Sequence, residues 1–142
     1  MLLIVAALSD AELLTMLNLA AELKLQVLVE AHNENELERA IKVLEQRGEN
    51  RTAVLLGINN RDLNTFITDL AVFERLATIV KGSTAAQIPL VAESGLFNAG
   101  DLVRMKRSGA NAYLIGESLV ATGDPGENLA SLLAETIKLL TL

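Results

Sequence analysis

The chain has no cysteine, a single histidine, only two prolines and an aromatic content of 3%. The absence of cysteine excludes disulfides and thiolate metal sites and fits a cytoplasmic location. No apolar run reaches the ~18 residues that a membrane-spanning helix needs, so we expect no membrane partner. The net charge of −6, without any basic run, argues against nucleic-acid binding. A small anion could still bind through backbone amides, which a charge count does not register.

The composition is that of a folded α/β domain. Hydrophobic residues make up 51% of the 142 residues and charged residues 21%, which suits parallel strands covered on both faces. No linker or change in composition divides the chain, so we expect one domain over residues 1–142. The apolar run over residues 2–8 lacks a basic flank and a cleavage site, and we interpret it as a strand and not as a signal peptide.

Five apolar runs alternate with helical patterns along the chain. The expected strands cover residues 2–8, 26–29, 53–56, 89–92 and 112–115, with a polar loop over 48–51. Helix starts are expected at Ser9, Asn33, Asp69, Asn98 and Pro125. This alternation predicts parallel strands with right-handed crossovers.

Every strand ends in polar residues on one side, and the chain lacks an early glycine-rich turn of the dinucleotide type. These two features favour an arc of a (β/α) barrel over an open doubly wound sheet. A complete barrel of eight units typically needs ~250 residues. The predicted fold class is therefore α/β, a partial barrel of about five βα units on a parallel sheet.

The last two strands each run into a glycine, Gly95 and Gly116. A glycine at the end of a strand exposes backbone N–H groups, and two such turns on neighbouring strands can hold one phosphate between them. The alternative is that each glycine only relieves steric crowding in a tight turn.

Four segments of the chain stand in the order and spacing of one known family. They are Val29-Glu30-Ala31-His32, Gly57-Ile58-Asn59-Asn60-Arg61-Asp62-Leu63, Ala92-Glu93-Ser94-Gly95-Leu96 and Ile115-Gly116-Glu117-Ser118-Leu119. In these segments the chain resembles indole-3-glycerol phosphate synthase, over about residues 2–125. The resemblance implies a (β/α)8 barrel, of which this chain would hold strands four to eight, with strands one to three absent.

The resemblance also implies an activity. Members of this family convert 1-(2-carboxyphenylamino)-1-deoxyribulose 5-phosphate into indole-3-glycerol phosphate, carbon dioxide and water, a step of tryptophan biosynthesis. The implied enzyme is a carboxy-lyase that acts on a phosphorylated small molecule without a cofactor. The family takes one active-site lysine from strand three and another from strand one, so we expect this chain alone to be inactive. The alternative is a catalytically inactive half barrel that binds phosphate or associates with itself.

The same resemblance implies roles for eight residues. They are Glu30 and Asn59 as catalytic residues, Arg61, Glu93 and Ser94 as substrate-binding residues, and Gly95, Gly116 and Glu117 as phosphate-binding residues. Apolar neighbours are expected to favour the neutral form of Glu30; the alternative for this residue is a solvated loop carboxylate. The segment around Asn59 and Arg61 could equally be a loop with internal turn bonds, in which Asp62 holds Arg61. We interpret His32 as a structural residue at a helix start, and no cluster of ligands predicts a metal.

An incomplete barrel exposes two sheet edges, here residues 2–8 and 112–115. We therefore expect the chain to associate with itself or to pair with the missing N-terminal part. A charge placed at Val5 would test the first edge.

Overall fold

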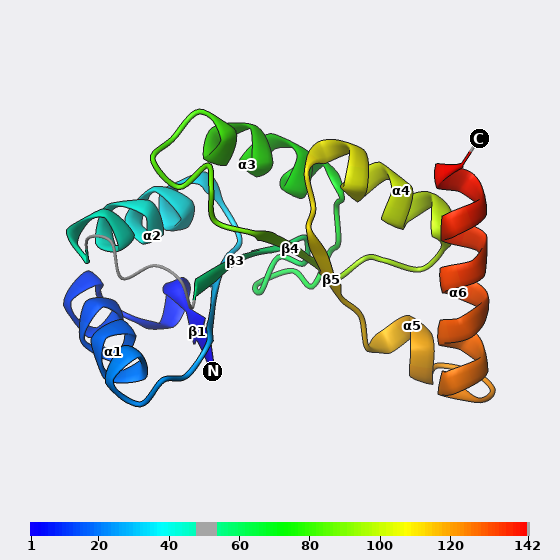
Figure 1. The fold of residues 1–142 in the computed structure, drawn as a ribbon, viewed down its shortest axis with the longest axis horizontal. Helices are drawn as coiled ribbons and strands as arrows, with labels where there is room; N and C mark the ends of the chain where they lie inside the picture. Colours follow the sequence, from blue (N-terminus) through cyan, green and yellow to red (C-terminus); the bar gives the residue numbers. More distant parts are fainter. Residues whose placement is uncertain (48–53, 142) are drawn as a thin grey trace.

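The computed structural model describes residues 1–47 and 54–141, which form an α/β fold on a five-stranded sheet (Figure 1). All neighbouring strands are parallel, and their spatial order is their order in the sequence. A doubly wound sheet would reverse its strand order at one point, whereas an arc of a barrel keeps it. The expected partial barrel is confirmed. The strands are β1 (Leu2–Ile4), β2 (Val27–Ala31), β3 (Val54–Asn59), β4 (Leu90–Glu93) and β5 (Ala112–Leu114).

The helices lie in an outer arc around the sheet, as Figure 1 shows. They are α1 (Asp10–Glu22), α2 (Glu34–Gln46), α3 (Ala71–Lys81), α4 (Ala99–Ser108), α5 (Glu117–Val120) and α6 (Pro125–Leu140). Three of the expected side-chain caps, Ser9, Asn33 and Asn98, accept a bond from the backbone of the first helical turn. Before α3 the cap position is taken by Leu70, and Asp69 accepts a bond from the N–H of Ala71. The short helix α5 has no counterpart in the sequence patterns. Within the described residues, no helix is long and apolar enough to cross a membrane.

Side chains alternate between the two faces of the sheet, as extended strands require. On β2, Val27, Val29 and Ala31 belong to the buried hydrophobic core. Glu30 lies on the opposite, inner face of the arc and pairs in register with Gly57 of β3, and Asn59 pairs with Glu93 of β4. The register therefore brings polar side chains of three strands to one end of the inner face.

The first strand is shorter than the sequence suggests. Residues 2–8 were expected to be one strand, but β1 ends at Ile4 and a 3-10 helix follows, η1 (Val5–Ala7). Arg39 of α2 explains this end, because its guanidinium donates to the carbonyl oxygens of Val5 and Leu8 at 3.3 and 2.6 Å. These two carbonyl oxygens therefore bond to Arg39 and do not pair with a neighbouring strand. A very short edge strand of this kind is a common protection against edge pairing.

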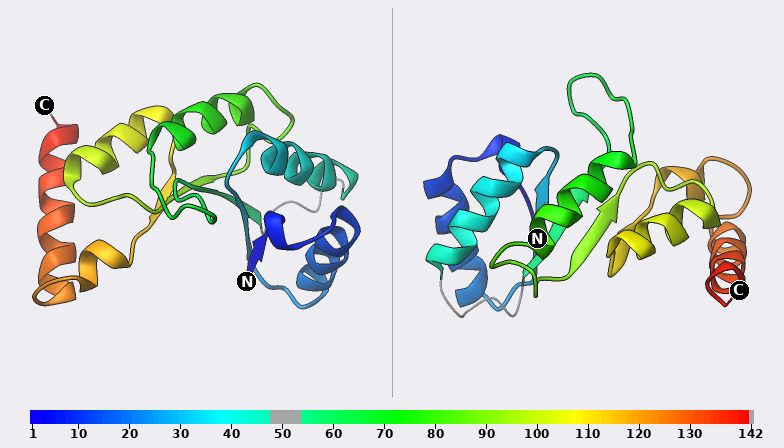
Figure 2. Two further views of the ribbon diagram at one scale, coloured as in Figure 1. Left: turned by 180° about the vertical axis from the view of Figure 1, so that it is seen from behind. Right: turned by 90° about the horizontal axis from the view of Figure 1, so that it is seen from above.

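The third strand is longer than expected, because pairing with both neighbours continues to Ile58 and Asn59. The connection from β3 to α3, which includes Arg61 and Asp62, then projects from the rest of the chain (Figure 2). The loop expected over residues 48–51 and the first residue of the expected strand at 53 lie outside the described residues.

Candidate functional site

All eight candidate site residues line one pocket of about 400 Å³ at the carboxyl ends of the strands. Leu96, Phe97, Leu114, Ile115 and Ser118 complete its lining. The two glycine turns are tied together here, because the Ser118 hydroxyl donates to the carbonyl oxygen of Leu96 at 2.8 Å. The carboxyl ends of parallel strands are the usual place of an active site in barrel folds.

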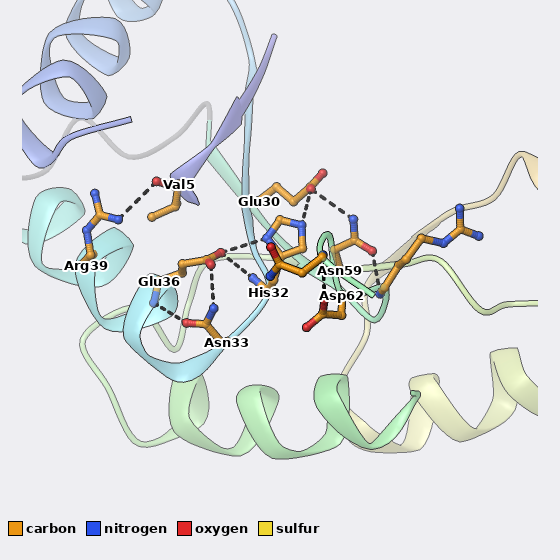
Figure 3. Close-up of polar contacts among 10 residues, drawn as sticks. Val5, Glu30, His32, Asn33, Glu36, Arg39, Asn59 and Asp62 are labelled. Atoms are coloured by element: carbon orange, nitrogen blue, oxygen red, sulfur yellow. Dashed lines mark hydrogen bonds and ion pairs between the residues drawn. The ribbon is translucent and has the colours of Figure 1, made fainter. Parts of the chain in front are cut away.

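Glu30 is buried at the end of β2, not solvated in a loop. Its Oε1 lies 2.9 Å from Nε2 of His32 and accepts a bond from Nδ2 of Asn59 at 3.1 Å (Figure 3). The close contact with His32 holds the pKa of Glu30 below its ordinary value, and this effect exceeds the opposing effect of burial. The expectation that the neutral form of Glu30 is favoured is therefore wrong.

The pKa of Glu93 is shifted in the opposite direction to that of Glu30. Its side chain, at the end of β4, is only 2% exposed. Burial, reinforced by the negative charge of Glu30, raises the pKa of Glu93 to about 8. The carboxyl group occupies space that Gly57 leaves free, since a Cβ on Gly57 would lie 1.8 Å from Glu93 Oε1. Near neutral pH the pocket thus holds one ionised and one protonated carboxyl group, a pattern that separates a base from an acid.

Arg61 and Glu117 form an ion pair across the pocket between the β3–α3 connection and α5. Asn59 supports the base of this connection, because its Oδ1 accepts a bond from the N–H of Arg61 at 3.0 Å. The suggestion that Asp62 holds Arg61 is wrong: the carboxylate of Asp62 instead accepts bonds from the backbone N–H groups of Asn64 and Thr65.

The two glycine turns differ in why they contain glycine. Gly95 has a φ of +72°, follows Ser94 at +61°, and would place a Cβ 2.4 Å from Cγ2 of Thr68. Steric relief therefore accounts for Gly95. Gly116 has a φ of −128°, and a Cβ there would meet no atom within 4 Å. Crowding within the described structure does not explain the second glycine, whose backbone is open to the pocket side.

Sequence reasoning missed two contributors to the site. His32 was interpreted as a structural residue, yet its ring contacts Glu30 directly. Asn60 is 1% exposed and links three segments: its Nδ2 donates to the carbonyl oxygens of Glu93 and Ser94, and its Oδ1 accepts from the N–H of Phe73. Asn60 therefore fixes the end of β4 against the start of α3. No cluster of three or more potential metal ligands occurs among the described residues.

Comparison with known proteins identifies relatives of this chain. A model of the family described as indole-3-glycerol phosphate synthase matches residues 1–132. Proteins named indole-3-glycerol phosphate synthase from Polaromonas naphthalenivorans (strain CJ2) and Azospirillum brasilense are 44% and 43% identical to it. Each match covers 94% of this chain and 46% of the relative. The chain thus spans about half the length of the relatives it matches.

Two solved structures share the fold. The crystal structure of the Amycolatopsis orientalis BexX/CysO complex matches 92% of this chain and 49% of its own, with a TM-score of 0.59 and 21% identity. A native KDPGal structure matches 96% of this chain and 56% of its own, with a TM-score of 0.58 and 18% identity. At these identities the likeness concerns the fold alone.

Proposed function

Because this chain belongs to the indole-3-glycerol phosphate synthase family, we propose that it carries one half of a synthase pocket. The family implies a decarboxylating lyase of tryptophan biosynthesis. The proposed reaction closes the indole ring of 1-(2-carboxyphenylamino)-1-deoxyribulose 5-phosphate with loss of carbon dioxide and water. We further propose that residues 1–142 form a single partial-barrel domain that acts in the cytoplasm.

The opposite states of Glu30 and Glu93 carry this proposal. Ring closure and dehydration need a group that donates a proton and a group that accepts one. The ionised Glu30 is suited to accept a proton, and the protonated Glu93 is suited to donate one to a substrate oxygen. Asn59 keeps an amide beside Glu30, and Arg61 and Ser94 lie on the wall of the same pocket. We assign substrate binding to Arg61, Ser94 and Glu93, and a catalytic role to Asn59 together with Glu30.

We assign the phosphate of the substrate to the space between Gly95 and Gly116. The open backbone at Gly116 supports this assignment, since an absent side chain lets an anion approach backbone N–H groups. Glu117 would contribute its N–H, and its ion pair with Arg61 reduces the repulsion of its carboxylate.

Inorganic phosphate titrated into the isotope-labelled chain tests the assignment. The largest amide shifts are expected at these two turns. Gly116→Ala should weaken binding without loss of stability, whereas Gly82→Ala, at another uncrowded glycine, should change neither. Shifts that are largest elsewhere would mean that the phosphate site is misplaced.

We also propose that the chain by itself is inactive. Its five lysines are Lys24, Lys42, Lys81, Lys106 and Lys138, and none of them lines the pocket among the described residues. The loss of a general acid typically lowers a rate ~10²–10⁴-fold.

Purified chain should give no measurable turnover of the carboxyphenylamino substrate. Activity should appear when the half of the Polaromonas relative that this chain does not match is added. Turnover by the chain alone, with host enzyme excluded, would contradict the proposal of inactivity.

We also propose that the chain associates with itself, and the exposed apolar face of α6 favours this. Four apolar side chains of this helix are 42–62% exposed at helical spacing: Leu129, Leu133, Ile137 and Leu140. A stripe of this kind is suited to pack on another apolar face. Figure 1 shows α6 at the end of the helical arc, and we propose a second copy of the chain as its occupant.

The mass of the chain in solution over a dilution series tests this association. Val5 is fully buried, so a charge there would disturb folding and not probe an edge. Ile137→Lys is the appropriate variant and should shift the chain towards monomer, whereas Ser131→Lys adds the same charge at an exposed polar position of α6 and should not. A monomer at every concentration would refute self-association, and binding only to the unmatched half of a relative would assign the stripe to that partner.

A further inference from the structure

We propose that His32, oriented by Glu36, is a positioning residue that keeps Glu30 ionised and so leaves the proton of the carboxyl pair on Glu93. This inference rests on the proposed function for its catalytic meaning, but its test does not depend on turnover. The proposed pattern of acid and base in the pocket would then originate in a side chain that need not touch the substrate.

The imidazole of His32 lies between two carboxylates (Figure 3). Its Nε2 is 2.9 Å from Oε1 of Glu30, and its Nδ1 is 2.9 Å from Oε2 of Glu36. The side chain of His32 is only 7% exposed, as is that of Glu30. A neutral imidazole has one donor and one acceptor nitrogen, and its acceptor nitrogen would face a carboxylate without a proton between them. When both carboxyl groups are ionised, the two contacts are satisfied together only if the ring is an imidazolium.

Glu36 is itself fixed in place. Its Oε2 also accepts a bond from the N–H of His32 at 2.9 Å, and its Oε1 accepts from Nδ2 of Asn33 at 2.6 Å. Asn33 caps α2, so the carboxylate is anchored to the start of that helix. The ring of His32 is therefore held on both sides, and it cannot turn away from Glu30 without also losing its contact with Glu36.

The charges that face the ring come from several elements. Glu36 projects from α2, Glu93 from β4 and Asp62 from the β3–α3 connection, and all of them are acidic. The contact with Glu30 is the largest cause that raises the pKa of His32 above its ordinary value, and Glu36 adds to it, while burial opposes both. An imidazolium stabilises the nearer carboxylate, Glu30, more than the farther one. Of the two carboxyl groups, Glu93 is then the one that retains a proton.

Because His32 is the only histidine of the chain, its ring signals in an NMR spectrum are unambiguous. A pH titration of the ring nitrogens and Cε1 in the whole chain gives its protonation directly. We expect both nitrogens to be protonated at pH 7 and the midpoint to lie above the ordinary ~6.5. Glu36→Gln should lower the midpoint by about 1 pH unit, the effect of removing an adjacent opposite charge. Glu38→Gln, at an exposed glutamate of the same helix, should leave it unchanged.

The carboxyl signals of Glu30 and Glu93 give the second measurement. In His32→Gln a neutral donor replaces the ring, so the midpoint of Glu30 should rise and that of Glu93 should fall by about 1 pH unit each. Circular dichroism shows whether the variant is folded. If His32 had only a structural role, the carboxyl midpoints of a folded His32→Gln would be those of the wild type. A wild-type midpoint of His32 at or below ~6.5 overturns the proposal by itself, whether or not the variants fold. Equal effects of Glu36→Gln and Glu38→Gln, or unmoved carboxyl midpoints in a folded His32→Gln, also overturn it. Absent turnover would bear only on the proposed function.

Discussion

Replacing the buried acid Glu93 with glutamine should change how the stability of the chain depends on pH. In the folded chain the pKa of Glu93 is raised from its ordinary 4.5 to about 8. An acid with a raised pKa binds its proton more tightly when folded, so its favourable contribution is complete at low pH. That contribution is lost as the pH rises from about 4.5 towards 8, because the unfolded chain ionises first. Glutamine keeps the size of the side chain and an N–H donor towards Glu30, but it does not titrate.

The size of the effect follows from the displaced pKa. The change from 4.5 to about 8 corresponds to at most roughly 5 kcal/mol at a pH above both values. Burial is the larger cause of this displacement, and relaxation of the site together with solvent in the open pocket lessens both burial and the effect of Glu30, so we expect about 2 kcal/mol. At pH 5 the wild type and Glu93→Gln should therefore differ by less than ~1 kcal/mol. At pH 8.5 the variant should be the more stable by about 2 kcal/mol.

Urea unfolding, followed by circular dichroism at intervals from pH 5 to pH 9, measures this difference. His32 contributes in the same direction, because its pKa is raised and its stabilising charge is lost as the pH rises through its folded pKa. Glu30 has a lowered pKa, so its contribution is lost only as the pH falls through that value, below this window. Both residues are present in both proteins, so the difference between the two curves reports the titration of Glu93 together with its effect on these two neighbours.

The control is Glu38→Gln, which removes an exposed charge from α2. Its unfolding free energy should follow that of the wild type in parallel at every pH. Parallel curves for Glu93→Gln as well would refute the reasoning, since they would mean that Glu93 ionises in the folded chain as it does in the unfolded chain. The assignment of Glu93 as a proton donor at neutral pH would fall with that result.

Two further substitutions test the packing around this acid. Gly57→Ala should lower the free energy of unfolding by about 1–3 kcal/mol, because its Cβ would collide with Oε1 of Glu93, whereas Gly82→Ala at an uncrowded glycine should change it by less than ~1 kcal/mol. Asn60→Ala should lower it by about 2–3 kcal/mol, since it leaves buried backbone groups without partners, and Asn64→Ala at an exposed site should be nearly neutral. Equal effects within either pair, measured by urea unfolding, would contradict the packing argument.

Much of the fold follows from local signals. The order of strands and helices is set by apolar runs, and the side-chain caps Ser9, Asn33 and Asn98 bond to the helix starts that they were expected to open. Such signals lie within a few residues of the element they define, so a sequence contains them directly. The end of β1 is different, because it depends on the contact of Arg39 with Val5 from 34 positions away. No local pattern encodes that contact.

In the candidate site, too, some features follow from the sequence and others depend on contacts between distant residues. The resemblance placed eight residues at strand ends, and parallel strands bring their ends together, so one shared pocket follows from topology. Asn60 could not be separated from its neighbour Asn59 by sequence. Both are asparagines at the end of one strand, and only the burial of Asn60 at 1% exposure distinguishes the residue that supports the backbone from the one that faces the pocket.

The charge states of Glu30 and Glu93 show why composition alone misleads about chemistry. Apolar neighbours suggested a neutral Glu30, but residues two apart at a strand end lie on the same face, which places His32 beside it. That Glu-x-His spacing was present in the sequence and predicts the contact. Glu93 depends instead on the register of β3 and β4, which sets its carboxyl over Gly57 and away from water. A carboxyl group is neutral here because a glycine on the next strand makes room for it, and its proton is retained because the histidine stabilises the charge of the other acid.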